Sequence, residues 1–145
     1  MFTKILFPTD FSAHAQKVKT EILKMKDCGI KELVLLHVVD KKLFGYSPIS
    51  NELTIDDMFI DGDITNSAEI KLKEWAKDLD STDIKIKYDI VKGNPFDEII
   101  EYSQKENCTL IIMGSKGLTE AEELLIGSVA EKVARKSKIP VMIIK

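Results

Sequence analysis

Three glycines and a serine in the last third of the chain have a spacing that could bind an anion. Gly114 and Gly117 are three residues apart, and Gly127 and Ser128 follow in the stretch MGSKGLTEAEELLIGSV. Glycines permit tight turns with exposed backbone amides, and the amino end of a helix that starts near Ser128 would offer further N–H groups. Both glycine groups could face one phosphate chain, so this loop is a candidate phosphate-binding segment.

The same loop differs from the common phosphate motifs and is acidic. The sequence has no GxxxxGK[ST], and the turn PTDFS after the first apolar run has no glycine, so a dinucleotide fingerprint is missing as well. The loop sets one lysine against three carboxylates: Lys116 against Glu120, Glu122 and Glu123. A carboxylate about 5 Å from a phosphate costs on the order of 1 kcal/mol or more. If phosphate binds, these glutamates must point to solvent, or Mg²⁺ must bridge them to it.

The cysteines, the histidines and one group of aspartates could in principle bind a metal or act in catalysis, but their spacing matches no recognisable site of either kind. Cys28 and Cys108 lack CxxC spacing and give no zinc signature with His14 and His37, so both thiols are interpreted as buried small apolar groups. We expect His37 to be a hydrogen-bonded core histidine and His14 to be exposed. A solvated, flexible segment is the favoured interpretation of four acids that do not fit a calcium loop: Asp56, Asp57, Asp61 and Asp63.

Composition narrows the classes of protein that remain. The chain has 145 residues, 44% hydrophobic and 31% charged, which predicts one domain over residues 1–145. A formal charge of −3 without a basic cluster argues against nucleic acid as a partner. The N-terminal apolar run is too short for a signal peptide, and no segment is long enough to span a membrane. We therefore expect a soluble, cytoplasmic protein.

Apolar runs alternate with stretches of helical spacing along the chain. Strands are predicted at residues 4–7, 33–39, 84–91, 110–113 and 140–144. Helices are predicted after Ser12, from Ala68 to Leu79 with Trp75 in the core, after the Asn94 cap, and after a capping box of Ser128 and Glu131. Residues 40–64 have no steady period and are expected to form an irregular insert. The predicted fold class is α/β, a single open five-stranded parallel sheet with helices on both faces.

This architecture places the glycine loop at a ligand site. In open parallel sheets, ligands bind outside the carboxyl ends of the strands, where the strand order reverses. The glycine loop begins at the end of the fourth predicted strand. We expect the ligand to meet the loop there.

The pattern Gly114-x2-Gly117-x9-Gly127-Ser128 resembles the signature of the universal stress protein family, in its nucleotide-binding branch. Further stretches that resemble this family occur in the same order: KILFPTDFS from Lys4, LLHVVD from Leu35, Gly93-x-Pro95, and the ending IPVMIIK. The resemblance covers nearly the whole chain and implies the universal stress protein fold, which is also similar to that of adenine nucleotide α-hydrolases.

The resemblance implies a site, a ligand and an assembly. Its positions imply nucleotide contacts by Pro8, Thr9, Asp10, Val38, Met113, Gly114, Ser115, Gly117, Gly127, Ser128 and Val129. The implied ligand is ATP, or ADP or AMP, with or without Mg²⁺, and its occupancy would act as a regulatory signal in stress. Family dimers imply a homodimer through the last strand, at Val141, Met142, Ile143 and Ile144.

Alternatives stay open at the level of sequence. Asp10 could be only an acid of a helix cap, and a capping box accounts for Ser128 without any ligand. Because of the acidic run Glu120–Glu123, the protein could instead be a nucleotide-free interaction module that binds a protein partner. No general base or arginine finger can be assigned, so a dedicated enzyme is not expected and slow ATP hydrolysis is the most that we expect. An enzyme of the α-hydrolase type is the third hypothesis, and bound adenine absorbance would separate the first two.

Overall fold

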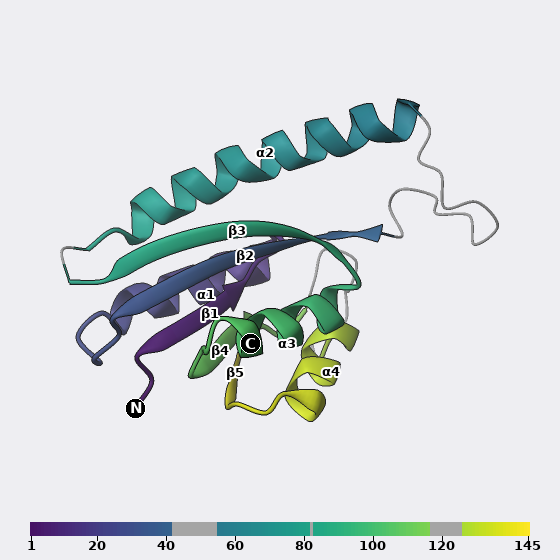
Figure 1. The fold of residues 1–145 in the computed structure, drawn as a ribbon. Helices are drawn as coiled ribbons and strands as arrows, with labels where there is room; N and C mark the ends of the chain where they lie inside the picture. The colour runs from purple at the N-terminus through teal and green to yellow at the C-terminus, as the bar shows by residue number, and fades with distance from the viewer. Residues whose placement is uncertain (42–54, 82, 117–125) are drawn as a thin grey trace.

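The computed structural model describes residues 1–41, 55–81, 83–116 and 126–145, and of residues 55–61 only the helical backbone. Five strands alternate with four helices within these ranges (Figure 1). In chain order they are β1 (Lys4–Pro8), α1 (Ala13–Lys24), β2 (Glu32–Asp40), α2 (Ile55–Leu79), β3 (Lys85–Gly93), α3 (Pro95–Lys105), β4 (Leu110–Gly114), α4 (Ser128–Lys136) and β5 (Val141–Ile144). The predicted α/β fold class is confirmed.

All strand pairs in the sheet are parallel, and the strand order is β3-β2-β1-β4-β5. The central strand β1 pairs with β2 on one side, where Ile5 is opposite Leu33, and with β4 on the other, where Ile5 is opposite Leu110. Strands β2 and β3 follow one another on one side of β1, and β4 and β5 follow one another on its other side. The strand order therefore reverses between β1 and β4, which is where such sheets leave a crevice.

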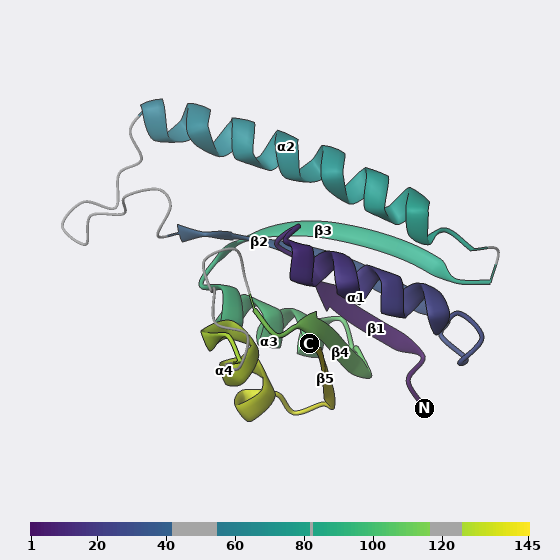
Figure 2. The same cartoon turned by 180° about the vertical axis from the view of Figure 1, so that it is seen from behind.

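Each face of the sheet is covered by two helices, as the two opposite views show (Figures 1 and 2). Side chains alternate along each strand, so Ile5 and Phe7 pack beneath α1 and α2, while Leu6 packs beneath α3 and α4. The central strands are apolar on both faces and nearly solvent-free. This explains why their sequences are continuous apolar runs.

Two predicted helix starts are confirmed at the level of single hydrogen bonds. Ser12 is the N-cap of α1, and its hydroxyl accepts from the Ala15 N–H at 3.2 Å. Asn94 caps α3 in the same way through the Phe96 N–H at 3.2 Å, and Pro95 occupies the first helical turn. Both caps satisfy backbone donors that a helix end leaves without partners.

The expected irregular insert over residues 40–64 is wrong for its last part, because α2 begins at Ile55 and not at Ala68. Residues 42–54 lie outside the described part of the chain. The buried side chains of α2 do begin at Ala68 and continue through Leu72, Trp75 and Leu79, as predicted. Gly62 and Asp63 are exposed on the same helix. The preceding turns therefore lack the apolar period on which sequence reasoning depends.

The structure also tests the predictions made for the two cysteines, for Trp75 and for membrane spans. Cys108 is buried as expected, but the interpretation of Cys28 as a buried thiol is wrong, because it is exposed next to Gly29. Trp75 packs in the core, with its ring centroid 5.8 Å from that of Phe7. None of the helices in the described ranges combines the length and the apolar character that a membrane span needs.

Candidate functional site

A cavity of about 320 Å³ lies at the carboxyl ends of β1, β2 and β4, beside the amino ends of α3 and α4. It is lined by Pro8, Thr9, Asp10, Ala15, Leu36, Val38, Asp40, Pro95, Ile99, Met113, Gly114, Ser115, Lys116, Gly127, Ser128, Val129 and Ala130. Its position is the one that the reversal of strand order predicts. A cavity of this size can enclose a small molecule.

Ten of the eleven predicted site residues lie around this one cavity. They are Pro8, Thr9, Asp10, Val38, Met113, Gly114, Ser115, Gly127, Ser128 and Val129. Gly117 lies outside the described residues. The ten come from four segments that are far apart in the sequence, so their convergence is a property of the fold.

The segment after β1 is held in place by short backbone contacts. The Thr9 N–H donates to the Leu36 carbonyl at 2.8 Å, and the Ser12 N–H donates to Asp10 Oδ1 at 2.9 Å. Asp10 therefore braces the turn before α1 and also lines the cavity. The two interpretations of Asp10, as a cap acid and as a cavity residue, do not exclude each other.

The two ends of the glycine loop meet at the start of α4. The Ser115 N–H donates to the Ile144 carbonyl at 3.0 Å, and the Ser115 carbonyl accepts from the Gly127 N–H. This contact brings the end of β4 next to the amino end of α4. Exposed amides and a helix amino end form the kind of environment that favours an anion.

The predicted capping box of Ser128 and Glu131 is wrong. Gly127 is the N-cap of α4, and its carbonyl accepts the first helical hydrogen bond, from the Glu131 N–H at 2.9 Å. The helix thus begins one residue earlier than a Ser128 cap requires. The Glu131 carboxylate pairs with Arg135 at 3.3 Å instead. Capping therefore does not account for Ser128, which lines the cavity.

Gly114 has a packing role besides its place in the cavity wall. A Cβ atom added there would lie 3.3 Å from the backbone carbonyl carbon of His14, so β4 approaches α1 more closely than most side chains allow. The expectation that His14 is simply exposed is wrong: the residue is half-buried, and its buried Nδ1 has no hydrogen-bond partner among the described residues.

Lys116 is the most informative cavity residue that sequence reasoning missed. It is only 8% exposed although lysines are rarely buried without a partner, and it lines the cavity next to Ser115. The other charged residues in the lining are Asp10 and Asp40. An anion in the cavity would offset the cost of burying the ammonium group. The sequence signal was present, because Lys116 is the one cation of the acidic glycine loop.

Six further lining residues were also missed as cavity residues: Ala15, Leu36, Asp40, Pro95, Ile99 and Ala130. Most are ordinary core positions whose exposure to a cavity depends on how the helices cover the sheet. The Gly93-x-Pro95 pair was a partial signal, since Pro95 places the first turn of α3 at the cavity wall.

Within the described ranges, no group of three or more histidine, cysteine, aspartate or glutamate side chains could hold a metal ion. Of the four acids considered above, the side chains of Asp56, Asp57 and Asp61 lie outside the described part, as do Glu120, Glu122 and Glu123. The carboxylates of Asp10 and Asp40 both line the cavity, and carboxylate oxygens are of the ligand type that Mg²⁺ prefers.

His37 is a hydrogen-bonded, half-buried histidine beside the site, as predicted. Its Nδ1 lies 2.8 Å from the Thr9 carbonyl oxygen, and its ring centroid lies 4.9 Å from that of Phe11. Burial holds the pKa of His37 below its usual value, and Lys71 adds to this effect, although the Thr9 bond and Asp10 oppose it. The ring is therefore neutral near neutral pH.

The fold and the cavity together define an open parallel α/β domain with a ligand-sized cavity at the switch point of its sheet. Comparison with known proteins identifies the family to which this α/β domain belongs. The model of the universal stress protein family matches residues 1–145, and the chain belongs to this family. It is 34% identical to universal stress protein MJ0577 of Methanocaldococcus jannaschii over 155 residues, covering 100% of this chain and 96% of that protein.

Solved structures agree with this assignment. A structure of MJ0577 has a TM-score of 0.87 at 34% identity and covers 100% of this chain and 96% of its own. Two structures with the same fold contain nucleotides. A universal stress protein in complex with cAMP has a TM-score of 0.61 at 24% identity, covering 99% of this chain and 96% of its own. A universal stress protein from Archaeoglobus fulgidus in complex with dAMP has a TM-score of 0.65 at 18% identity, and the match covers 100% of both chains.

Proposed function

We propose that this protein binds an adenine nucleotide in the cavity, and that occupancy acts as a regulatory signal in the stress response of the cytoplasm. The observation that carries the proposal is the cavity itself. It gathers ten of the eleven residues that the family resemblance marks for nucleotide contact, from four separate segments. Two other proteins of this fold form complexes with cAMP and dAMP, so the fold can host an adenine nucleotide.

The lining suits the two ends of a nucleotide. Apolar side chains that could pack against a base come from Leu36, Val38 and Met113, beside Asp10, whose carboxylate could accept from ribose hydroxyls. The amino end of α4 and Lys116, which is largely buried and lines the cavity, could hold phosphate. Base and phosphate thus have different partners in one cavity.

ATP is the leading ligand, with ADP and AMP as alternatives, and bound Mg²⁺ would offset the repulsion between phosphates and the carboxylates of Asp10 and Asp40. A regulatory role is favoured over a dedicated enzymatic one. The titratable side chains in the described lining are the carboxylates of Asp10 and Asp40 and the amine of Lys116, and this described lining contains no histidine, cysteine or arginine.

The proposal is tested by what the protein carries when purified. Denatured protein should release an adenine nucleotide that chromatography and mass spectrometry identify, or the stripped protein should take one up. Protein that releases no nucleotide and takes none up would favour the alternative, a nucleotide-free interaction module. That alternative rests on the acidic residues Glu120, Glu122 and Glu123 of the glycine loop.

We also propose a homodimer through β5. Val141, Met142, Ile143 and Ile144 form a half-buried, apolar edge of the sheet, whereas the opposite edge strand, β3, carries charged residues including Lys85 and Lys87. Charged side chains on an edge strand discourage pairing, and the apolar edge at β5 lacks that protection. Sedimentation should show a dimer that Ile143→Lys converts to a monomer. The same charge at Ile70, an exposed apolar residue of α2, should leave it dimeric.

A further inference from the structure

Three aromatic rings, of His37, Phe11 and Trp75, pack together next to the segment that carries Thr9 and Asp10. We call them the aromatic cluster. The ring centroid of Phe11 lies 4.9 Å from that of His37 and 5.5 Å from that of Trp75, which α2 contributes. Thr9 and Asp10 line the cavity, whereas none of the three rings does. The cluster therefore adjoins the candidate site without belonging to its wall.

The contact between His37 and Thr9 fixes the state of the imidazole. A carbonyl oxygen can only accept, so Nδ1, at 2.8 Å from the Thr9 oxygen, must carry the hydrogen. Because burial lowers the pKa of His37, the neutral ring has its proton on Nδ1 and an unprotonated Nε2. The Thr9 carbonyl is thus held by a donor of defined position.

Phe11 shows that this segment is constrained. Its φ of 62° lies in the left-handed region, which bulky residues avoid. Such a conformation persists only where the surroundings determine it. Here the Phe11 N–H donates to Thr9 Oγ1 at 3.0 Å, and its ring packs against those of His37 and Trp75. The unusual backbone places Asp10 and Ser12 so that their hydrogen bond can form.

We propose that His37 is a positioning residue of the cavity: its Nδ1–H holds the Thr9 carbonyl and its ring supports Phe11, so that Asp10 stays in the cavity wall. The inference rests on the proposed function, since the ligand concerned is the adenine nucleotide. It gives His37 a role beyond that of a packed core histidine. Through Trp75, it also links the conformation of the site to α2.

Three variants distinguish the effect of the His37–Thr9 hydrogen bond on nucleotide binding from the effect of core packing. His37→Phe keeps a ring but removes the donor, His37→Asn keeps a donor near the position of Nδ1, and Val39→Ala opens a small hole two residues further along β2. We expect His37→Phe to weaken nucleotide binding about three- to tenfold, the change that loss of one ordinary hydrogen bond produces. His37→Asn should recover most of the affinity. Val39→Ala should lower the melting temperature and leave the dissociation constant unchanged.

Nuclear magnetic resonance of the whole protein supplies a readout that does not depend on binding. The ¹⁵N shifts of His37 should show the Nδ1–H tautomer, and the Phe11 and Ser12 amides should exchange faster with solvent in His37→Phe than in Val39→Ala. An Nε2–H tautomer, equal affinities of the wild type and His37→Phe, or a failure of His37→Asn to restore binding would overturn the proposal. If the wild type binds no nucleotide, the proposed function fails, while the tautomer and exchange results still decide whether His37 positions this segment.

Discussion

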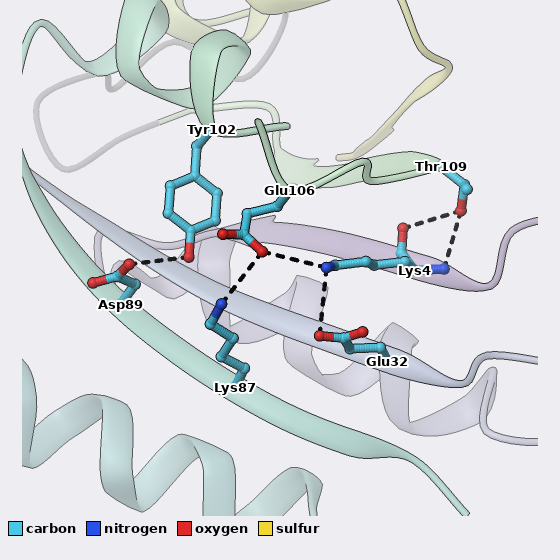
Figure 3. A network of polar contacts seen from close by, with 7 residues as sticks. All are labelled: Lys4, Glu32, Lys87, Asp89, Tyr102, Glu106 and Thr109. Atoms are coloured by element: carbon cyan, nitrogen blue, oxygen red, sulfur yellow. Dashed lines mark hydrogen bonds and ion pairs between the residues drawn. The ribbon is translucent and has the colours of Figure 1, made fainter. Parts of the chain in front are cut away.

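The two ends of the sheet use charged side chains in opposite ways. At the amino end, Lys4 of β1 lies 3.5 Å from Glu32 and 3.4 Å from Glu106, and Lys87 lies 3.3 Å from the same Glu106 oxygen (Figure 3). At the carboxyl end, Lys116 is more deeply buried than Lys4 and lines a cavity. Among the described residues, Lys116 has no carboxylate within ion-pair distance.

The difference separates structural charges from charges available to a ligand. Glu106 at the end of α3 joins two strands through their lysines, and these attractions hold its pKa below the usual value. Further along β3, Tyr102 adds a bond from its hydroxyl to Asp89, which is level with Leu36, at 3.1 Å (Figure 3). The lysines and glutamates of the amino end satisfy one another. At the other end, Lys116 and the amino end of α4 adjoin a cavity that an anion could fill, although Asp10 and Asp40 also line it.

The largest expected effect is on ligand affinity at the carboxyl end. Lys116→Met should weaken AMP binding by about tenfold or more, since a hydrogen bond to a charged group is typically worth about 1.5–3 kcal/mol. Adenosine, which lacks phosphate, should bind both proteins equally. Calorimetric titration gives the four dissociation constants.

Lys4→Met is the matched control for that experiment. It removes a lysine whose partners are protein carboxylates, so it should lower the melting temperature and leave AMP affinity unchanged. Equal loss of AMP affinity in the two variants would remove the distinction between the two ends.

A smaller effect is expected on stability, from the bond between Tyr102 and Asp89 in the middle of β3. Tyr102→Phe removes the hydrogen bond to Asp89 and should cost about 1 kcal/mol, or about 3 °C in melting temperature. Tyr88→Phe is the control, since its hydroxyl has no hydrogen-bond partner among the described residues. Nucleotide affinity should not change in either variant. A larger loss from Tyr88→Phe would show that the Tyr102–Asp89 bond drawn in Figure 3 does not stabilise the protein as expected.

The smallest effects should appear as two separate acid transitions in stability. His37 has a lowered pKa, so its contribution is full above its usual value of 6.5 and is lost as pH falls through its folded value below that. Glu106 also has a lowered pKa, so its contribution is lost only as pH falls below 4.5. Denaturant unfolding against pH should lose the upper step in His37→Phe and the lower step in Glu106→Gln. A single step, unaffected by either change, would contradict this assignment.

Sequence patterns predicted the fold well where local rules and burial agreed. The central strands are apolar because both of their faces are covered, and Ser12 and Asn94 start their helices through the caps that their side chains predict. The start of α2 was missed because the sequence before Ala68 has no steady apolar period, whereas Ala68, Leu72, Trp75 and Leu79 have one and are buried. Ser128 was misassigned because Gly127 caps the helix with its backbone alone, which leaves no side-chain signal.

The site was predictable where it follows a motif and not where it follows tertiary packing. Residues of the β1 end and the glycine loop carry a linear pattern, and the fold brings them together. Ile99 and Ala15 reach the cavity only because α3 and α1 cover opposite faces of the sheet near its carboxyl end. Lys116 had a sequence signal, as the one cation of the acidic glycine loop, but its burial at the cavity could not be read from that signal.

Titration of ATP into the stripped protein, with and without Mg²⁺ and beside a Glu122→Lys variant, tests the central claim most directly. We predict micromolar binding by the wild type, strengthened by Mg²⁺. No binding by the wild type, under conditions in which Glu122→Lys binds, would show that the acidic loop excludes the nucleotide and would contradict the proposed function.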